Sequence, residues 1–223
     1  FAAKVGREFG IAVSNGTAAL DIAFELIDLQ PGDEVIIPAF TIISCVHQII
    51  RRGAIPVLID CDSNTWNMDT ALIESRISTR TRAILVVHIY GLPTNMADIE
   101  RITQQHGLFL IEDAAEAHGL SFDGRPCGSF GDVSTFSFYP NKLITTGEGG
   151  MIVFQNEADY KAAAAWHDHG HENNPSVPRW EDTRASSGFN FRMTEMQGAV
   201  GLAQLKKLSH VVAMQRKNRD AMW

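Results

Sequence analysis

The sequence predicts an α/β fold in which helices cover both faces of a mainly parallel sheet. Between Gly10 and Phe154, apolar runs with strand character alternate with segments of helical periodicity. The strand-like runs are apolar throughout, as in 83–87, and this is typical of parallel strands buried on both faces. A length of 223 residues, with 45% hydrophobic and 20% charged residues, suits one large globular domain or at most two.

Each element is marked by its own residues. Short runs rich in Ile, Val, Leu and Phe predict strands at residues 10–14, 34–37, 55–60, 83–88, 108–111, 133–138 and 151–154. Segments with helical spacing and composition predict helices at residues 18–27, 42–52, 69–77 and 96–106, and a helical, basic pattern covers residues 205–222. Proline and glycine support the boundaries, because Pro31-Gly32 would end the first helix. Pro56 stands near a strand start, where a missing N–H is tolerated, and Pro140 cuts the run at 133–138.

Charge and cysteine content exclude several classes of protein. The 19 basic and 26 acidic residues give a net charge of −7, which argues against binding to nucleic acid or to an anionic membrane. The three cysteines are far apart and form no C-x-x-C, so we expect neither a disulfide framework nor a zinc knuckle. A reducing cytoplasm fits this pattern best.

No apolar run approaches the ~18 residues of a membrane span. The chain begins with Phe1 and stops inside a helical pattern, so we expect both ends to be cut.

One lysine is distinguished by its neighbours. Of the six lysines, Lys142 alone lies outside a helix-like stretch, between the runs at 133–138 and 151–154. The glycine-dense turn 147–150 follows it, so a backbone or a ligand can approach closely. An amine held there could be desolvated and act as a nucleophile. A solvated lysine in a hairpin turn accounts for the same spacing equally well.

The turn after the first predicted strand has two interpretations. Residues 14–17, Ser-Asn-Gly-Thr, enter a helix whose exposed N–H groups and positive dipole end would bind an anion. Gly16 would let a phosphate come close, whereas plain capping by Asn15 or Thr17 explains the same residues. Neither a Walker loop nor a G-x-G-x-x-G fingerprint occurs in the chain.

Strand-end residues are candidates because ligands of such sheets bind beyond the carboxyl ends of the strands. Asp113 directly follows an apolar run and could hold a ring N–H by a charge-assisted hydrogen bond, or cap the segment after it. Its neighbour Glu112 is expected to pair elsewhere. Phe40 could stack on a planar ring, although a place in the core accounts for an aromatic residue there as well.

Three histidines alternate in the sequence at positions 167, 169 and 171. That spacing would suit metal ligands on a strand, but Gly170 and the segment 173–175 indicate a loop. No cysteine or Asp-rich partner motif lies nearby, so we predict no metal site.

The order of the candidate features is more specific than any one of them. It runs from a phosphate turn through an aromatic residue and a strand-end acid to Ser137, Lys142 and a glycine turn. A site for pyridoxal 5'-phosphate (PLP) requires an anion cradle, a ring sandwich, a partner for the pyridinium nitrogen and a Schiff-base amine. The order therefore predicts a PLP site.

Four stretches resemble the DegT/DnrJ/EryC1/StrS family of PLP-dependent sugar aminotransferases. They are SNGTAAL at 14–20, EDAAEAHG at 112–119, FSFYPNK at 136–142 with TTGEGG at 145–150, and GFNFRM at 188–193. The resemblance covers essentially the whole chain and implies the type I, aspartate aminotransferase-like fold. Residues 1–223 would form its large, PLP-binding domain, with a seven-stranded, mainly parallel sheet between helices. Family members are longer, so the leading helix and the C-terminal small domain are expected to be missing.

The resemblance implies a role for each motif residue. Lys142 would join PLP as a Schiff base, and Asp113 would pair with the pyridine nitrogen. The other contacts to the cofactor would come from Gly16, Thr17 and Ser137 at the phosphate, Phe40 on the ring face and Glu116 at the ring hydroxyl. Asn190 would reach across to the phosphate of a partner subunit, which implies an obligate homodimer with a shared active site.

The resemblance also implies two half-reactions, with glutamate as the expected amino donor and a keto-sugar as the acceptor. The segments 139–142 and 145–149 look most like those of enzymes that aminate nucleotide-linked 4-keto-6-deoxy sugars for amino-sugar and polysaccharide biosynthesis. Arg179 and Arg184, in the loop 167–184, could meet a diphosphate or the carboxylate of a free keto-acid sugar of the octulosonate or nonulosonate type. A solvated or dimer-contact loop is equally compatible with these residues.

Some positions depart from the family pattern. Family members usually have serine or threonine where Asn15 stands and often tyrosines at Phe189 and Phe191, and these changes affect the substrate assignment most. Relatives that dehydrate their substrate have histidine in place of Lys142, so the lysine argues against that branch. A non-catalytic regulator on the same fold would lack Lys142 or Asp113. A lyase using a metal or a lysine Schiff base would need no phosphate cradle.

Overall fold

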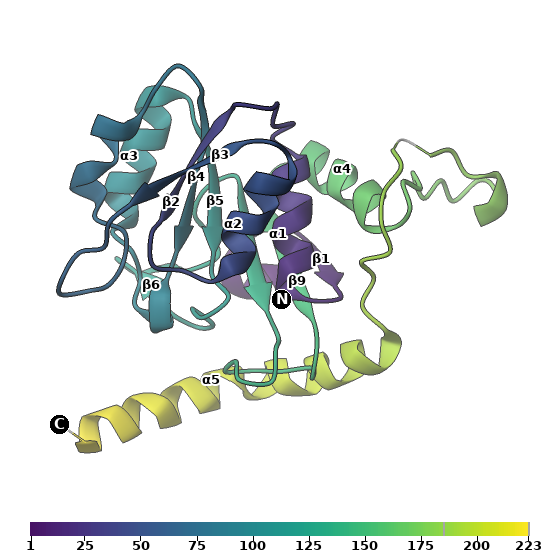
Figure 1. Cartoon of the computed structure of the whole chain (residues 1–223). Coiled ribbons are helices and arrows are strands. Elements are labelled where there is room, and N and C mark those ends of the chain that lie inside the picture. Colours follow the sequence, from purple (N-terminus) through teal and green to yellow (C-terminus); the bar gives the residue numbers. More distant parts are fainter. Residues whose placement is uncertain (185, 223) are drawn as a thin grey trace.

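A seven-stranded sheet forms the centre of the molecule (Figure 1). The computed structural model describes residues 1–184 and 186–222. In spatial order the strands are β1 (Phe9–Val13), β9 (Gly150–Phe154), β8 (Val133–Ser137), β5 (Phe109–Asp113), β4 (Thr81–Val87), β2 (Glu34–Pro38) and β3 (Ile55–Ile59). From β8 to β3 all neighbours are parallel, whereas β9 is antiparallel to both β1 and β8. The predicted mainly parallel, seven-stranded sheet is therefore confirmed.

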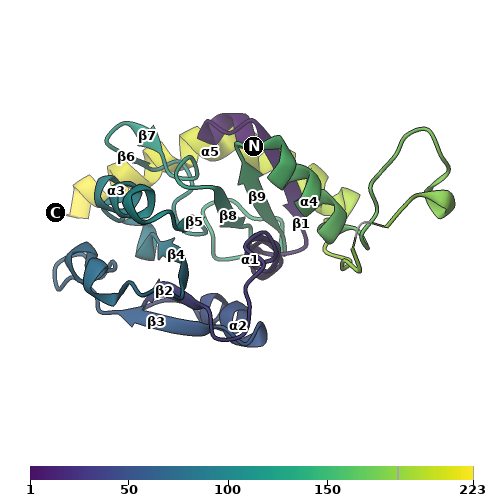
Figure 2. The ribbon, with the colours of Figure 1, turned by 90° about the horizontal axis from the view of Figure 1, so that it is seen from above.

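Helices lie on both faces of the sheet (Figure 2). They are α1 (Gly16–Glu25), α2 (Ile43–Arg51), α3 (Met96–His106), α4 (Glu157–His167) and α5 (Glu195–Met222). Short 3₁₀ turns occur at η1 (Ala2–Val5), η2 (Thr70–Leu72), η3 (Glu74–Arg76), η4 (Ile89–Gly91) and η5 (Arg179–Glu181), and β6 (Ser121–Phe122) pairs with β7 (Arg125–Pro126). No helix in the described part of the chain combines the length and apolar character that a membrane crossing requires.

The pleat of each strand divides the core between the two faces. In β2, Val35 and Ile37 pack in the cluster that includes residues of α1, α2 and α4, whereas Ile36 packs in the cluster that includes α3. A third cluster joins η1, β8 and β9 to α5 through Leu208, which is buried. Both faces of the central strands are covered, which explains why strands such as β2 are apolar at consecutive positions, whereas Ile55 and Leu58 of the edge strand β3 stay exposed.

Asparagine side chains begin three of the helices. Asn15 accepts a hydrogen bond from the N–H of Ala18 at 2.8 Å, and Asn95 and Asn156 cap α3 and α4 in the same way. Gly107 ends α3 in the left-handed conformation, at φ 63°. The starts of α1 and α3 lie within two residues of those expected from the sequence, whereas α4 was given no bounds there.

The predicted helix at 69–77 is wrong, because this segment forms the two short turns η2 and η3 instead. The side chain of Asp69 accepts from the N–H of Ala71 at 3.0 Å, and the hydroxyl of Ser75 donates to the carbonyl of Leu72 at 2.8 Å. Such local side-chain bonds compete with the i→i−4 ladder of a helix. Ile73 is fully buried, which anchors the turns without a longer helix.

The sheet directions bring distant segments to one edge. Val13 at the end of β1 and Ser137 at the end of β8 both pair with Gly150, the first residue of β9. Asp113 ends β5, which lies next to β8, so its carboxyl also reaches this edge. The segments before α1, after β5 and after β8 therefore meet at the carboxyl ends of the parallel strands.

Candidate active site

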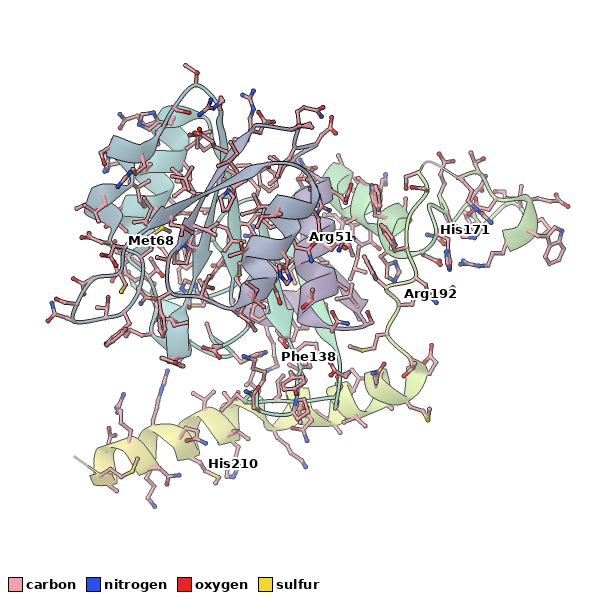
Figure 3. The ribbon with its side chains drawn as sticks, viewed as in Figure 1. Arg51, Met68, Phe138, His171, Arg192 and His210 are labelled. Carbon is pink, nitrogen blue, oxygen red and sulfur yellow. The ribbon has the colours of Figure 1, made fainter. Side chains whose placement is uncertain are left out.

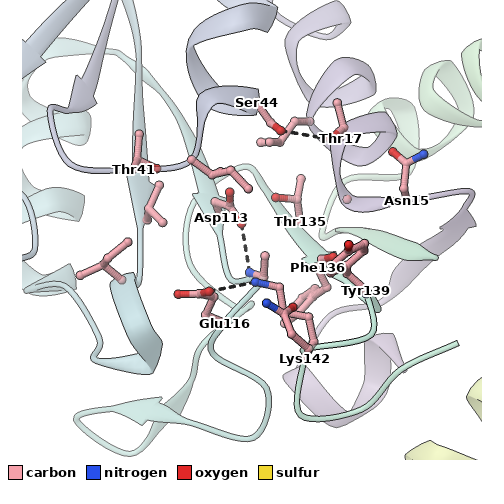
Figure 4. Close-up of a pocket in the computed structure, with 18 of the residues that line it drawn as sticks. Asn15, Thr17, Thr41, Ser44, Asp113, Glu116, Thr135, Phe136, Tyr139 and Lys142 are labelled. Carbon is pink, nitrogen blue, oxygen red and sulfur yellow. Dashed lines mark hydrogen bonds and ion pairs between the residues drawn. The ribbon is translucent and has the colours of Figure 1, made fainter. Parts of the chain in front are cut away.

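A pocket of about 730 Å³ opens at this edge of the sheet (Figure 4). Seven of the eight predicted site residues line it, namely Gly16, Thr17, Phe40, Asp113, Glu116, Ser137 and Lys142. These residues come from the turns and strand ends of four different sequence regions. Asn190 is the one predicted residue that does not line the pocket.

Lys142 faces into the pocket and is 13% exposed in its side chain. Its Nζ donates to Oε1 of Glu116 at 2.9 Å (Figure 4). The backbone N–H of Lys142 bonds to the carbonyl of Tyr139 at 3.0 Å, so a tight turn after β8 directs the side chain inward. The other oxygen of Glu116 accepts from the N–H of Tyr90 at 2.8 Å. The amine is therefore held by one acid rather than solvated in a hairpin turn.

Asp113 lines the same pocket as the lysine and is 3% exposed. Oδ1 accepts from the N–H of Ala115 at 3.0 Å, and Oδ2 accepts from the thiol of Cys45 at 3.6 Å. Burial raises the pKa of the Asp113 carboxyl above its ordinary value. The hydrogen bonds from Ala115 and Cys45 and the charge of Lys142 lower this pKa, but by less than burial raises it. Burial and the charge of Asp113 raise the pKa of Cys45 well above its ordinary value, so the thiol stays protonated and donates.

The turn before α1 forms a cradle with the ends of β8 and β9. A Cβ on Gly16 would lie 2.9 Å from Cβ of Ser137, and a Cβ on Gly150 would lie 2.6 Å from the backbone of Asn15. Only glycine at both positions allows these backbones to approach so closely. The hydroxyls of Thr17 and Ser44 lie 3.1 Å apart on the pocket side. A helix N-terminus with flanking hydroxyls can bind a phosphate.

Gly16→Ala is expected to weaken PLP binding by about 10-fold or more, because the new methyl group would separate the turn from Ser137. The free energy of unfolding should fall by about 1–3 kcal/mol. A cofactor titration and a urea denaturation curve would measure the two effects. Gly198→Ala, inside α5, is the matched control: apart from the backbone of its own helix, no described atom lies within 4 Å of the added Cβ, so stability should rise by about 0.5–1 kcal/mol. Equal effects of the two substitutions would contradict the cradle.

Glu112, the acid next to Asp113, points to the other side of the strand and pairs elsewhere, as expected. Its carboxylate accepts from Ser134 Oγ at 2.7 Å and from the backbone N–H groups of Gly128 and Phe130 at 2.6 and 2.9 Å. His88 Nε2 lies 2.9 Å from the same carboxylate. Because Nδ1 of His88 accepts from the backbone of Thr94, Nε2 is the nitrogen that carries the proton. This buried hydrogen-bond network stabilises the strand that carries Asp113, on the side away from the pocket.

His118 is buried beside the pocket, and neither ring nitrogen has a hydrogen-bond partner of good geometry among the residues that the structure describes. The ring lies 5.6 Å from the ring of Phe136 and 5.9 Å from that of Phe138. Burial, followed by the charge of Lys142, lowers the pKa of His118 to about 4, although the Ser137 backbone raises it slightly. His118 is therefore neutral at physiological pH.

His118 should make stability depend on pH. Since its folded pKa lies below the ordinary 6.5, its contribution is complete above pH 6.5 and is lost as pH falls toward 4. The loss over this window is about 3 kcal/mol, because the unfolded chain binds the proton more tightly. His118→Phe should reduce the slope of Tm against pH, whereas His210→Gln, on the exposed surface of α5 (Figure 3), should retain it. An unchanged slope in His118→Phe would be evidence against this assignment.

Asn190 is exposed and lies along the segment that follows α4. It forms an antiparallel bridge with Asp168, and its side chain accepts from Nε of Arg192 at 2.9 Å. Asp168 is paired with Arg179 at 2.5 Å and with Arg192 at 3.0 Å. Burial raises the pKa of Asp168, but Arg179 and Arg192 with a smaller effect of His167 together lower it below its ordinary value. The predicted contact of Asn190 with a partner subunit stays a prediction.

Two of the three alternating histidines, His167 and His171, have separate local partners. His167 ends α4, with Nδ1 3.2 Å from the carbonyl of Ala164. His171 lies farther out (Figure 3), where its Nδ1 is 3.2 Å from Asp182 and 2.9 Å from Nη1 of Arg184. The segment that carries η5 projects away from the sheet (Figure 1). Arg179 and Arg184 are therefore engaged within the loop.

Several pocket residues were not predicted from the sequence. Ser44 in the first turn of α2 and Tyr90 in η4 line the pocket and contact Thr17 and Glu116. Cys45, behind the pocket wall, donates to Asp113. The hydroxyl of Thr135 is buried at the pocket wall with no hydrogen-bond partner among the described residues. Its position near the end of β8 was the available signal, since residues at strand ends face the site.

Known proteins resemble the chain in sequence and in structure. It is 40% identical to the GDP-perosamine synthase of Escherichia coli O157:H7 over 222 residues, which cover 99% of this chain and 59% of the relative. It is 44% identical to the GDP-perosamine synthase of Caulobacter vibrioides over 217 residues, 97% of this chain and 57% of the relative. The chain thus spans less than two thirds of the length of these relatives.

A solved structure supports the predicted fold class. The E. coli GDP-4-keto-6-deoxy-D-mannose-3-dehydratase with bound hydrated PLP superposes with a TM-score of 0.92 at 31% identity. The match covers 99% of this chain and 61% of that one. The sequence model of the DegT/DnrJ/EryC1/StrS aminotransferase family matches residues 1–222. The chain therefore belongs to the DegT/DnrJ/EryC1/StrS aminotransferase family.

Proposed function

We propose that the chain is the cofactor-binding large domain of a PLP-dependent aminotransferase that acts on a keto-sugar. The observation that carries this proposal is the convergence of Lys142, Asp113 and the Gly16–Ser137 cradle in one pocket. An amine, a buried acid and an anion site from separate segments are the three anchors that the aldehyde, ring nitrogen and phosphate of PLP need. Residues 1–223 would supply the whole of this pocket, apart from any contribution of a partner subunit.

The pocket residues fit PLP by their own chemistry. The close approach of Gly16 to Ser137 leaves α1 N–H groups and the Thr17, Ser44 and Ser137 hydroxyls for a phosphate. The unpaired hydroxyl of Thr135 is a further polar group at the wall. When bound, PLP supplies an electron sink for the carbon that gains or loses the amino group.

The chain's residues would perform the remaining work. Lys142 would bind the cofactor covalently and, once displaced, its Nζ would take and return the proton at the reacting carbon. Glu116, 2.9 Å from that Nζ, would hold the amine in place and face the ring hydroxyl. Asp113 would keep the ring nitrogen protonated, while Ala115 and Cys45 fix the direction of its carboxylate.

For the substrate we propose a nucleotide-linked 4-keto-6-deoxy sugar, with glutamate as amino donor. Two relatives of 40% and 44% identity are GDP-perosamine synthases, whose name is that of a nucleotide-linked amino sugar. Lys142 provides the proton-transferring amine that transamination requires. Arg179 and Arg184 are engaged within their loop, so they support neither a diphosphate nor the carboxylate of the alternative substrate, a free keto-acid sugar.

The active assembly we propose is a homodimer. Asn190 is exposed, and its segment lies against β1 through the bridge of Arg192 with Val13. From this position Asn190 would contact the phosphate bound by a second subunit. Both PLP sites would then require two chains.

The test is to load the protein with PLP, record its visible spectrum and screen keto-sugars with glutamate. We expect a PLP absorbance band, its loss on adding glutamate and its return on adding a nucleotide-linked 4-keto-6-deoxy sugar. Turnover only with free keto-acid sugars would favour the alternative substrate. Absence of the band and of any transamination would refute the proposed function.

A further inference from the structure

Three aromatic side chains form an exposed group beside the pocket. Phe40, Trp66 and Tyr90, here called the aromatic platform, are 37%, 56% and 78% exposed. The ring centroid of Phe40 lies 5.5 Å from that of Trp66 and 6.0 Å from that of Tyr90. Phe40 and Tyr90 also line the pocket, so the platform is continuous with the site of Lys142.

Two of the three aromatic residues have a strained backbone. Trp66 has φ 62° and Tyr90 has φ 51°, values at which bulky side chains are disfavoured and glycine is at ease. Neither ring gains burial in exchange, because both side chains are mostly exposed. Such strain persists only where the surroundings impose it, and it gathers at functional sites.

Specific hydrogen bonds impose this conformation at Trp66. Oδ1 of Asp62 accepts from the backbone of Asn64 at 3.0 Å and of Thr65 at 2.9 Å, and the N–H of Trp66 closes the turn on the carbonyl of Asp62 at 2.9 Å. Asn67, which is 4% exposed, then joins this turn to η4. The turn is therefore rigid before any ligand arrives.

The turn of Tyr90 is fixed from both sides. Asn67 donates to the carbonyl of Leu92 at 2.9 Å and accepts from the N–H of Ile89 at 3.1 Å. The N–H of Tyr90 donates to Glu116 at 2.8 Å, and Glu116 in turn holds Lys142. The platform and the catalytic amine thus share one framework, which sets their relative position.

We propose that the outer rings of the aromatic platform, Trp66 and Tyr90, are a subsite that binds the nucleobase of the acceptor by stacking, and this rests on the proposed function for its substrate class. The reacting sugar must reach Lys142 inside the pocket, whereas Trp66 lies beyond Phe40 and outside the pocket lining. The part of the substrate that meets Trp66 is therefore the part remote from the reacting carbon. Exposed aromatic faces bind nucleobases by stacking, with little dependence on which base is present.

Direct titration separates the base from the rest of the ligand. GDP is added to the PLP-loaded protein and binding is followed by calorimetry, with inorganic pyrophosphate as the base-free probe. Trp66→Ala should weaken GDP binding about 10-fold or more and leave pyrophosphate binding unchanged. Trp66→Phe, which keeps a ring, should lose less than Trp66→Ala.

Two further variants separate stacking from folding. Trp66→Asn suits the left-handed backbone, so it should lose GDP affinity while Tm stays the same or rises. Leu72→Ala removes a comparably exposed apolar side chain from η2 and should leave GDP affinity unchanged. If Trp66→Asn bound GDP as tightly as the unaltered protein, stacking on this ring would be refuted.

The remaining outcomes show whether the nucleobase subsite or the proposed function is wrong. GDP binding that Trp66→Ala does not weaken, or a change of oligomeric state in place of a change in affinity, would overturn the subsite. Transamination of a nucleotide-linked keto-sugar with the same KM in Trp66→Ala would overturn it while the function stands. Trp66-dependent GDP binding in a protein that does not transaminate would support the subsite and refute the function.

Discussion

Lys142→Ala is expected to abolish both the visible absorbance of covalently bound PLP and measurable transamination. Among the described residues that line the pocket, Lys142 is the only lysine, and its Nζ is held 2.9 Å from Glu116. The covalent link and the proton transfer both depend on this amine, so the rate should fall by more than about 10⁴-fold. Absorbance spectra and single-turnover assays with glutamate would measure the two losses.

The other lysines offer a control for charge and expression. Lys161, in α4, is 70% exposed and pairs with Glu157 one turn earlier. Lys161→Ala should keep the spectrum and the rate, since exposed pairs of this kind contribute little. Retention of the band and of turnover in Lys142→Ala would remove Lys142 from its proposed role.

Asp113→Asn is expected to leave PLP bound but to slow transamination by about 10²- to 10³-fold. The phosphate cradle and Lys142 remain in place, so affinity should change little. An amide is neutral and cannot stabilise a protonated ring nitrogen, and the site admits little water because Asp113 is 3% exposed. The electron sink would lose the charge on which it depends.

The spectrum of Asp113→Asn after loading shows whether the cofactor is retained, and pre-steady-state kinetics give the rate of the chemical step. Asp98, at the start of α3, accepts hydrogen bonds from Asn95 and Thr70 and lies outside the pocket lining. Asp98→Asn should therefore keep the rate of the unaltered protein. An equal rate in Asp113→Asn would show that this carboxylate does not support the ring nitrogen.

The sequence predicts the parts of the fold that depend on local pattern. Apolar runs of strand length gave the seven strands within a few residues, and parallel strands bring their carboxyl ends together. The gathering of Asp113, Ser137 and Lys142 follows from that rule alone. The helix expected at 69–77 does not form, because the side chains of Asp69 and Ser75 make local hydrogen bonds to the backbone that replace helical ones.

Contacts between elements leave no local trace in the sequence. The thiol of Cys45 on α2 reaches Asp113 on β5, and Asn67 joins two loops whose sequences are unrelated. Neither contact follows from periodicity, since each depends on which strands become neighbours. The strain at Trp66 and Tyr90 was equally hidden, because aromatic residues rarely adopt a left-handed backbone.

The pairing of β1 with β9 has a consequence for biosynthesis. Val13 emerges from the ribosome before its partner Gly150, which follows roughly 7–30 s later at ordinary elongation rates. During that interval the first strand has no permanent neighbour, and the anion cradle cannot close. We therefore expect the nascent chain to need protection by chaperones until β8 and β9 arrive, and vitamin B6 to be captured only late in synthesis.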